Sequence, residues 1–158
     1  MPAPKTTKRP AGARTKSDNV FTDEERAAVQ ATARERKSQA RLSPQEERAA
    51  GEQEVRDKIA EMPTPDREMG KRIHALVTKA APGLVPRTYY GMPAYAKDGK
   101  VICFFKPASK FKVRYASFEF QPDARLDDGE MWPVSFAVTK LTAGVVSRIA
   151  ELVKKAAG

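Results

Sequence analysis

The chain has 158 residues, enough for one domain of ordinary size with a hydrophobic core. Its formal net charge of +9 favours anionic partners such as nucleic acid and carries no information on the fold. The sequence has no apolar run long enough to span a bilayer, and its single cysteine, Cys103, excludes an internal disulfide. We therefore expect a cytoplasmic protein with no membrane segment.

Residues 1–20 form the first of three predicted regions. They are rich in Pro, Lys, Thr and Ala, and contain no apolar residue able to anchor a core. Such a segment cannot offset the entropy lost on ordering, so we expect a disordered basic tail. It also lacks the apolar stretch of a secretory signal.

Residues 21–61 are predicted to form a helical extension. Thr22 with an acid three residues later, and Ser43 followed by proline, are typical helix starts. The first helix, from residue 23 to about 41, has Val29 as its only large aliphatic residue, so we expect it to be solvated. The second carries a thin apolar stripe and has Gly51 in its middle, which argues against a continuous rod. That stripe consists of Val55, Ile59 and Met62.

Residues 62–158 carry the pattern of an α+β domain: a helix, an antiparallel meander of strands and a last helix. The first helix has a convincing core face, formed by Met69, Ile73, Leu76, Val77 and Ala80 at helical spacing. The last helix begins at Thr142, and its apolar face consists of Val145, Val146, Ile149, Leu152 and Val153. Both helices are expected to pack on one face of the sheet.

The strands between these helices are predicted from alternation and turn residues. Residues 91–93, Gly-Met-Pro, predict a kink or bulge within a strand, whereas Asp98-Gly99 predicts a two-residue hairpin turn. Alternation of apolar and basic residues over 111–115 predicts a half-buried strand. Phe118 and Phe120 fall on the opposite parity, which requires a bulge near residues 116–117. A further strand is expected at 134–138.

The stretch AAPGLVPRTYYGMPAYAKDGKVICFF, residues 80–105, resembles the YdhG-like family, a domain of unknown function. Its YGMPAY core lies at 90–95, and the resemblance covers roughly residues 62–158. It implies the frataxin-like fold, an α-β-sheet-α sandwich, with no established enzymatic activity. Some members are labelled iron chaperones because of that fold kinship, so the resemblance makes an iron-binding or chaperone-like role the first functional expectation.

Iron is the one cofactor that this kinship suggests, held by surface carboxylates. Hard oxygen ligands suit such a cation. The best cluster consists of Asp123, Asp127, Asp128 and Glu130. The alternative is a solvated turn, because Asp-Asp-Gly is ordinary turn chemistry.

Basic residues suggest a second function, binding of nucleic acid or another anionic partner. On the expected strand, Lys110, Lys112 and Arg114 would project from one face, with Lys106 extending the stripe. Lys5, Lys8 and Arg9 of the tail would add a sequence-independent attraction for phosphates. The alternative is a soluble sheet face protected by lysines, with a solubilising tail.

Aromatic residues suggest a third function, a groove for a small ligand or a peptide. The candidates are Tyr89, Tyr90, Met92, Tyr95, Phe104 and Trp132. Convergent aromatic side chains with polar tips suit such a ligand, and the alternative is that they fill the core.

We expect no enzymatic activity. The sequence contains none of the common phosphate-binding, metalloprotease or serine-hydrolase motifs. Cys103 lies in an apolar run typical of a core strand, and His74 is the only histidine that could activate it.

Overall fold

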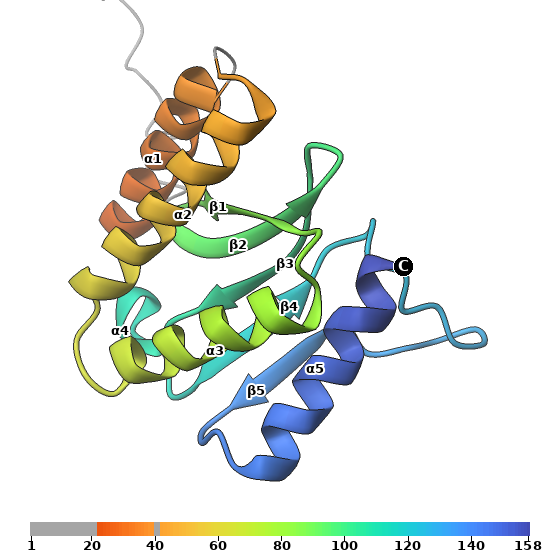
Figure 1. The fold of residues 1–158 in the computed structure, drawn as a ribbon. Helices are drawn as coiled ribbons and strands as arrows, with labels where there is room; N and C mark the ends of the chain where they lie inside the picture. The colour runs from red at the N-terminus through yellow and green to blue at the C-terminus, as the bar shows by residue number, and fades with distance from the viewer. Residues whose placement is uncertain (1–21, 40–41) are drawn as a thin grey trace, which may run out of the picture.

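The computed structural model describes residues 22–39 and 42–158, so the predicted disordered tail with Lys5, Lys8 and Arg9 lies outside the described residues. The elements in chain order are α1 (Asp23–Gln39), α2 (Pro44–Glu61), α3 (Asp66–Ala80), β1 (Val85–Tyr89), β2 (Met92–Lys97), β3 (Lys100–Lys106), α4 (Ala108–Phe111), β4 (Ala116–Phe120), β5 (Ser135–Val138) and α5 (Ala143–Ala157). The five strands form one antiparallel sheet in the order β1-β2-β3-β4-β5 (Figure 1). The predicted α+β class, with helices, an antiparallel meander and a last helix, is confirmed.

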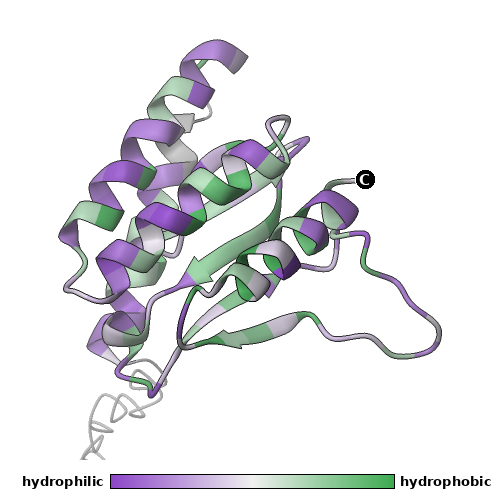
Figure 2. Cartoon of the chain, turned by 60° about the horizontal axis from the view of Figure 1, so that its bottom comes forward, coloured by the Kyte–Doolittle hydropathy of each residue, from purple (hydrophilic) through white to green (hydrophobic). Residues whose placement is uncertain are grey.

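The core lies between one face of the sheet and the helices α3 and α5, which lie side by side (Figure 1). The predicted apolar stripes of these two helices form the helical side of the core, and Ile73, Val77 and Val153 are fully buried in it. Phe105 and Phe118 contribute from the sheet. Figure 2 shows that the strands are mostly hydrophobic, whereas the helices alternate hydrophobic and hydrophilic residues. None of the described helices is both long and apolar enough to cross a membrane.

Helix α2 packs into the same core. All three residues of the predicted stripe, Val55, Ile59 and Met62, are buried there. Gly51 does not interrupt the helix but allows it to approach the sheet, because a Cβ at this position would lie 1.9 Å from the carbonyl oxygen of Pro86 in β1. Glycine is therefore required by close backbone contact between α2 and β1.

A β-bulge decides which side chains of β3 face the core. Tyr95 pairs with Cys103 and Ala96 pairs with Val101, which leaves Ile102 as an extra residue. Ile102 and Cys103 are therefore both in the core, whereas Val101 packs with Phe104 in a separate cluster on the opposite face. The predicted bulge at residues 116–117 is absent from β4, whose pairing with β3 and with β5 is regular.

The predicted strand at 111–115 is wrong. Residues 108–111 form the short helix α4, Lys112 adopts a left-handed conformation with φ 53°, and the chain becomes a strand only at Ala116. Asp66, at the start of α3, holds this helix by accepting hydrogen bonds from the backbone N–H (2.9 Å) and the hydroxyl of Ser109. The alternation over 111–115 is therefore typical of a strand, but tertiary contacts give this segment another conformation.

We predict opposite effects of alanine at two helical glycines. Gly51→Ala would force α2 away from β1 and lower the free energy of unfolding by about 1–3 kcal/mol, as overpacking does. In α5, a Cβ at Gly144 would have no atom within 4 Å. Gly144→Ala should therefore raise the free energy of unfolding by about 0.4–1 kcal/mol, because alanine lowers the conformational entropy of the unfolded chain. Urea unfolding of both variants measures the difference. Equal effects would contradict the close approach of α2 to β1.

Candidate ligand groove on the open face of the sheet

Strands β1 and β2 are joined by a two-residue hairpin turn, Tyr90-Gly91, with φ values of 49° and 74°. Positive φ at both central residues is the mark of a tight hairpin turn. The predicted kink within a strand at 91–93 is therefore wrong, because the chain reverses immediately before Met92. The predicted hairpin at Asp98-Gly99 is confirmed, again with two positive φ values, of 51° and 77°.

The Tyr90-Gly91 turn is held from two sides. The backbone N–H of Tyr90 donates to Thr32 Oγ1 of α1 at 2.7 Å, and Lys110 Nζ of α4 donates to the carbonyl oxygen of Tyr90 at 2.8 Å. A Cβ at Gly91 would lie 2.2 Å from Lys110 Nζ, so a larger residue would displace this amine from its present position, and the φ of 74° at Gly91 also favours glycine. The hairpin therefore fixes α1 and α4 relative to the sheet.

The sequence suggested that helix α1 is solvated, but one of its faces is buried. Ala28, Thr32 and Glu35 form a buried face at helical spacing, and the helix packs beside β1. An ion pair of 2.5 Å between Lys112 Nζ and Glu24 Oε1 connects the first turn of α1 to the chain after α4. The buried face consists of small and polar residues, which explains why no apolar stripe revealed it.

A cavity of about 460 Å³ lies on the face of the sheet opposite the core. Its walls come from α1, the β1–β2 hairpin, β3, α4 and β4. The apolar lining consists of Ala28, Val29, Tyr89, Tyr90, Met92, Phe104 and Phe111, and the polar lining of Glu25, Lys106, Glu119 and Gln121. We call this cavity the groove.

The aromatic side chains of the groove form a continuous wall. The ring centroids of Tyr89 and Tyr90 are 4.5 Å apart in an edge-on arrangement, and those of Tyr89 and Phe104 are 5.4 Å apart. Lys106 Nζ lies 5.0 Å from the centroid of the Phe111 ring. This arrangement offers aromatic surface to a flat ligand and charged groups to its polar substituents.

Four of the six residues proposed for a groove lie together here, namely Tyr89, Tyr90, Met92 and Phe104. Tyr95 faces the opposite way, because it alternates with Ala94 along β2, and it is 1% exposed in the core. Trp132 packs against the main core as well. Sequence reasoning missed Phe111, which it had assigned to a strand, and Ala28 and Val29, which it had assigned to a solvated helix.

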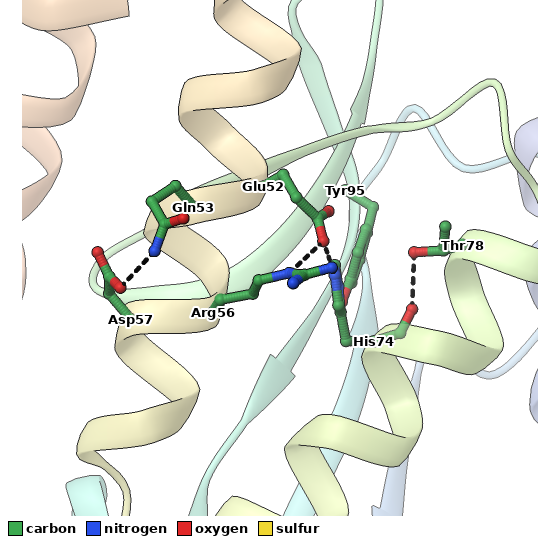
Figure 3. Close-up of polar contacts among 7 residues, drawn as sticks. All are labelled: Glu52, Gln53, Arg56, Asp57, His74, Thr78 and Tyr95. Carbon is green, nitrogen blue, oxygen red and sulfur yellow. Dashed lines mark hydrogen bonds and ion pairs between the residues drawn. The ribbon is translucent and has the colours of Figure 1, made fainter.

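Tyr95 belongs to a polar network that crosses the core side of the molecule (Figure 3). His74 Nδ1 lies 2.9 Å from the Tyr95 hydroxyl, and His74 Nε2 lies 2.8 Å from Glu52 Oε1, which also accepts from Arg56 Nε at 2.7 Å. Burial works to raise the pKa of Glu52, but the hydrogen bonds from His74 and Arg56 outweigh it and lower that pKa. The network ties α2, α3 and β2 together.

Cys103 does not have the environment of a nucleophile. It is fully buried, and this burial raises the pKa of its thiol far above the usual value. Both ring nitrogens of His74 are already engaged by Tyr95 and Glu52. A reactive thiolate needs the opposite conditions, a lowered pKa and an adjacent base.

The carboxylates proposed for iron lie on the long loop between β4 and β5, which projects from the body of the molecule (Figure 2). Asp123, Asp127, Asp128 and Glu130 are all exposed, and Asp123 lies 3.7 Å from Lys100 Nζ. Within residues 22–39 and 42–158, no three His, Cys, Asp or Glu side chains converge as metal ligands would.

The four basic residues proposed as a stripe do not form one, because α4 and the left-handed Lys112 replace the expected strand. Lys106 lines the groove and Lys110 holds the hairpin turn. Lys112 pairs with Glu24, and the guanidinium of Arg114 lies 5.2 Å from the centroid of the Tyr115 ring.

Comparison with known proteins adds no identification. No protein-family model, no curated protein and no solved structure matches the chain. Membership of the YdhG-like family and kinship to frataxin therefore stay predictions, and the groove is interpreted from its own geometry.

We predict different roles for two neighbouring lysines. Lys110→Met would leave the Tyr90 carbonyl without its donor and lower the free energy of unfolding by about 1–2 kcal/mol. Burial, followed by repulsion from Lys58, lowers the pKa of Lys110, in keeping with its position inside the structure. Lys112→Met removes only an exposed ion pair and should leave stability unchanged. Equal stability of the two variants in urea unfolding would contradict the role of Lys110.

Proposed function

We propose that the chain is a non-enzymatic binding protein that takes a small organic ligand with a flat apolar body into the groove. The observation that supports this proposal is the convergence of α1, the β1–β2 hairpin, β3, β4 and α4 on one aromatic-walled cavity. Its volume of about 460 Å³ falls in the range of small-molecule sites, roughly 300–1,000 Å³. Apolar walls with a few polar groups are also typical of such sites.

The two other functions expected from the sequence have less support. An iron-binding role would need converging carboxylates, and the described part of the chain offers no such set. A nucleic-acid interface would need a basic stripe beside exposed rings, whereas the four lysine and arginine side chains lie in separate contacts. Phe104 is 7% exposed, so it provides the floor of a cavity rather than an open stacking platform.

A titration with indole, a neutral flat molecule, tests this function. In an amide NMR titration of the full-length protein, we expect saturable shifts at residues 25–29, 89–92, 104 and 111. Val29→Lys places a charge at an exposed position of the lining and should weaken indole binding by about tenfold, which corresponds to ~1.4 kcal/mol.

The matched control for this experiment is Val134→Lys. Val134 is 44% exposed, as Val29 is 45% exposed, but it lies outside the groove. We expect this variant to bind indole as the unaltered protein does. Shifts confined to other surfaces, or equal weakening by both substitutions, would contradict the proposed site.

A further inference from the structure

We propose that the ligand of the groove is an aromatic zwitterion, a flat aromatic molecule that carries both an ammonium and a carboxylate group, as an aromatic α-amino acid does. This inference rests on the proposed function and names the chemical class of its ligand. It is carried by three charged side chains of the lining, Lys106, Glu119 and Glu25, and by the rings between them.

Lys106 provides the positive charge of the groove. It follows Phe104 by two positions on β3, so both side chains project from the open face of the sheet. Within the described residues no carboxylate forms an ion pair with Lys106, and its ammonium lies over the Phe111 ring instead. An ammonium group in this position can receive a carboxylate from a ligand.

Glu119 provides a fixed negative charge next to it. Glu119 pairs directly with Phe104 across β3 and β4. Its Oε2 accepts from the Ser117 hydroxyl at 3.0 Å, and its Oε1 accepts from the Ser135 hydroxyl at 3.2 Å. These neutral donors orient the carboxylate without compensating its charge, and each oxygen retains a lone pair for a further donor.

Glu25 adds a second negative charge from the opposite wall. It lies in the first turn of α1, which lines the groove with Ala28 and Val29. An ammonium group that enters between α1 and β4 therefore has carboxylates on both sides. The wall between these charges consists of Tyr89 and Phe104, which suit the aromatic body of the ligand.

The mixture of signs distinguishes the zwitterion from simpler ligands. Glu25 and Glu119 would repel a purely anionic ligand, and Lys106 would repel a purely cationic ligand. Charge complementarity selects the partner that compensates both signs, because like charges placed together are unfavourable. A phosphate-rich polymer is disfavoured for the same reason, with two carboxylates beside one lysine.

Isothermal titration of the full-length protein with four probes tests the class of ligand. The probes are L-phenylalanine, which carries both charges, phenethylamine with only the ammonium, 3-phenylpropionate with only the carboxylate, and indole with neither. We expect L-phenylalanine to bind at least tenfold more tightly than phenethylamine and 3-phenylpropionate.

Two conservative variants assign the charges. Lys106→Met should reduce the affinity for L-phenylalanine about tenfold, while phenethylamine binds at least as tightly as before. Glu119→Gln should weaken L-phenylalanine binding to a similar extent and leave 3-phenylpropionate binding at least as tight. Lys100→Met, on the same strand but outside the groove, serves as the control and should change neither. Circular dichroism shows whether each variant is folded.

The outcomes separate this inference from the proposed function. If indole binds in the groove but L-phenylalanine has no advantage over the singly charged probes, the zwitterion is wrong and the ligand groove stands. If Lys106→Met and Lys100→Met affect L-phenylalanine binding equally, the assignment of the carboxylate to Lys106 is overturned. If none of the four probes binds, both the class of ligand and the proposed function fail.

Discussion

The Tyr90-Gly91 turn is the constraint on which the open face of the sheet depends. The backbone N–H and carbonyl of Tyr90 are satisfied by side chains from distant parts of the chain, Thr32 on one side and Lys110 on the other. Buried backbone groups need such partners, because leaving them unpaired costs as much as a lost hydrogen bond. The turn therefore positions α1 and α4 without a large apolar interface, and the groove is the space that these two helices leave above Phe104.

The two faces of the sheet are built by different physical means. The core face depends on apolar burial by α2, α3 and α5, supplemented by the Glu52–His74–Tyr95 network. The open face carries a small cluster, Met92, Ala94 and Phe104, over which partly exposed rings and charged side chains gather. A stable core on one side allows the other side to keep a cavity with charged residues in its lining, which is the usual division between scaffold and site.

The sequence predicted the elements whose signals are local. Apolar residues at helical spacing predicted the core faces of α3 and α5, and Asp98-Gly99 predicted its hairpin because this dipeptide favours positive φ. The faces of α1 and α4 could not be predicted in this way. The contact face of α1 has no large apolar residue, and α4 depends on Asp66, which lies more than 40 positions earlier in the chain.

Only part of the groove lining could be predicted from the sequence. Tyr89, Tyr90, Met92 and Phe104 were grouped from their aromatic character, whereas excluding Tyr95 required the strand register. The bulge at Ile102 changes which side chains of β3 point to the core, and no residue pattern predicted a bulge at this position. The partners of the hairpin turn, Thr32 and Lys110, are set by tertiary contacts alone, so the hydrophobic periodicity of the sequence could not predict them.

Hydrogen exchange of the Tyr90 amide tests the central claim most directly, namely that α1 docks on the hairpin and completes the groove. The hydrogen bond to Thr32 Oγ1 predicts slow exchange in the full-length protein. It also predicts much faster exchange in Thr32→Val, which keeps the shape of the side chain but removes the acceptor. The Phe104 amide, deep in the sheet, should be unaffected. Unprotected exchange of Tyr90 in the unaltered protein, or equal protection in both proteins, would contradict the account.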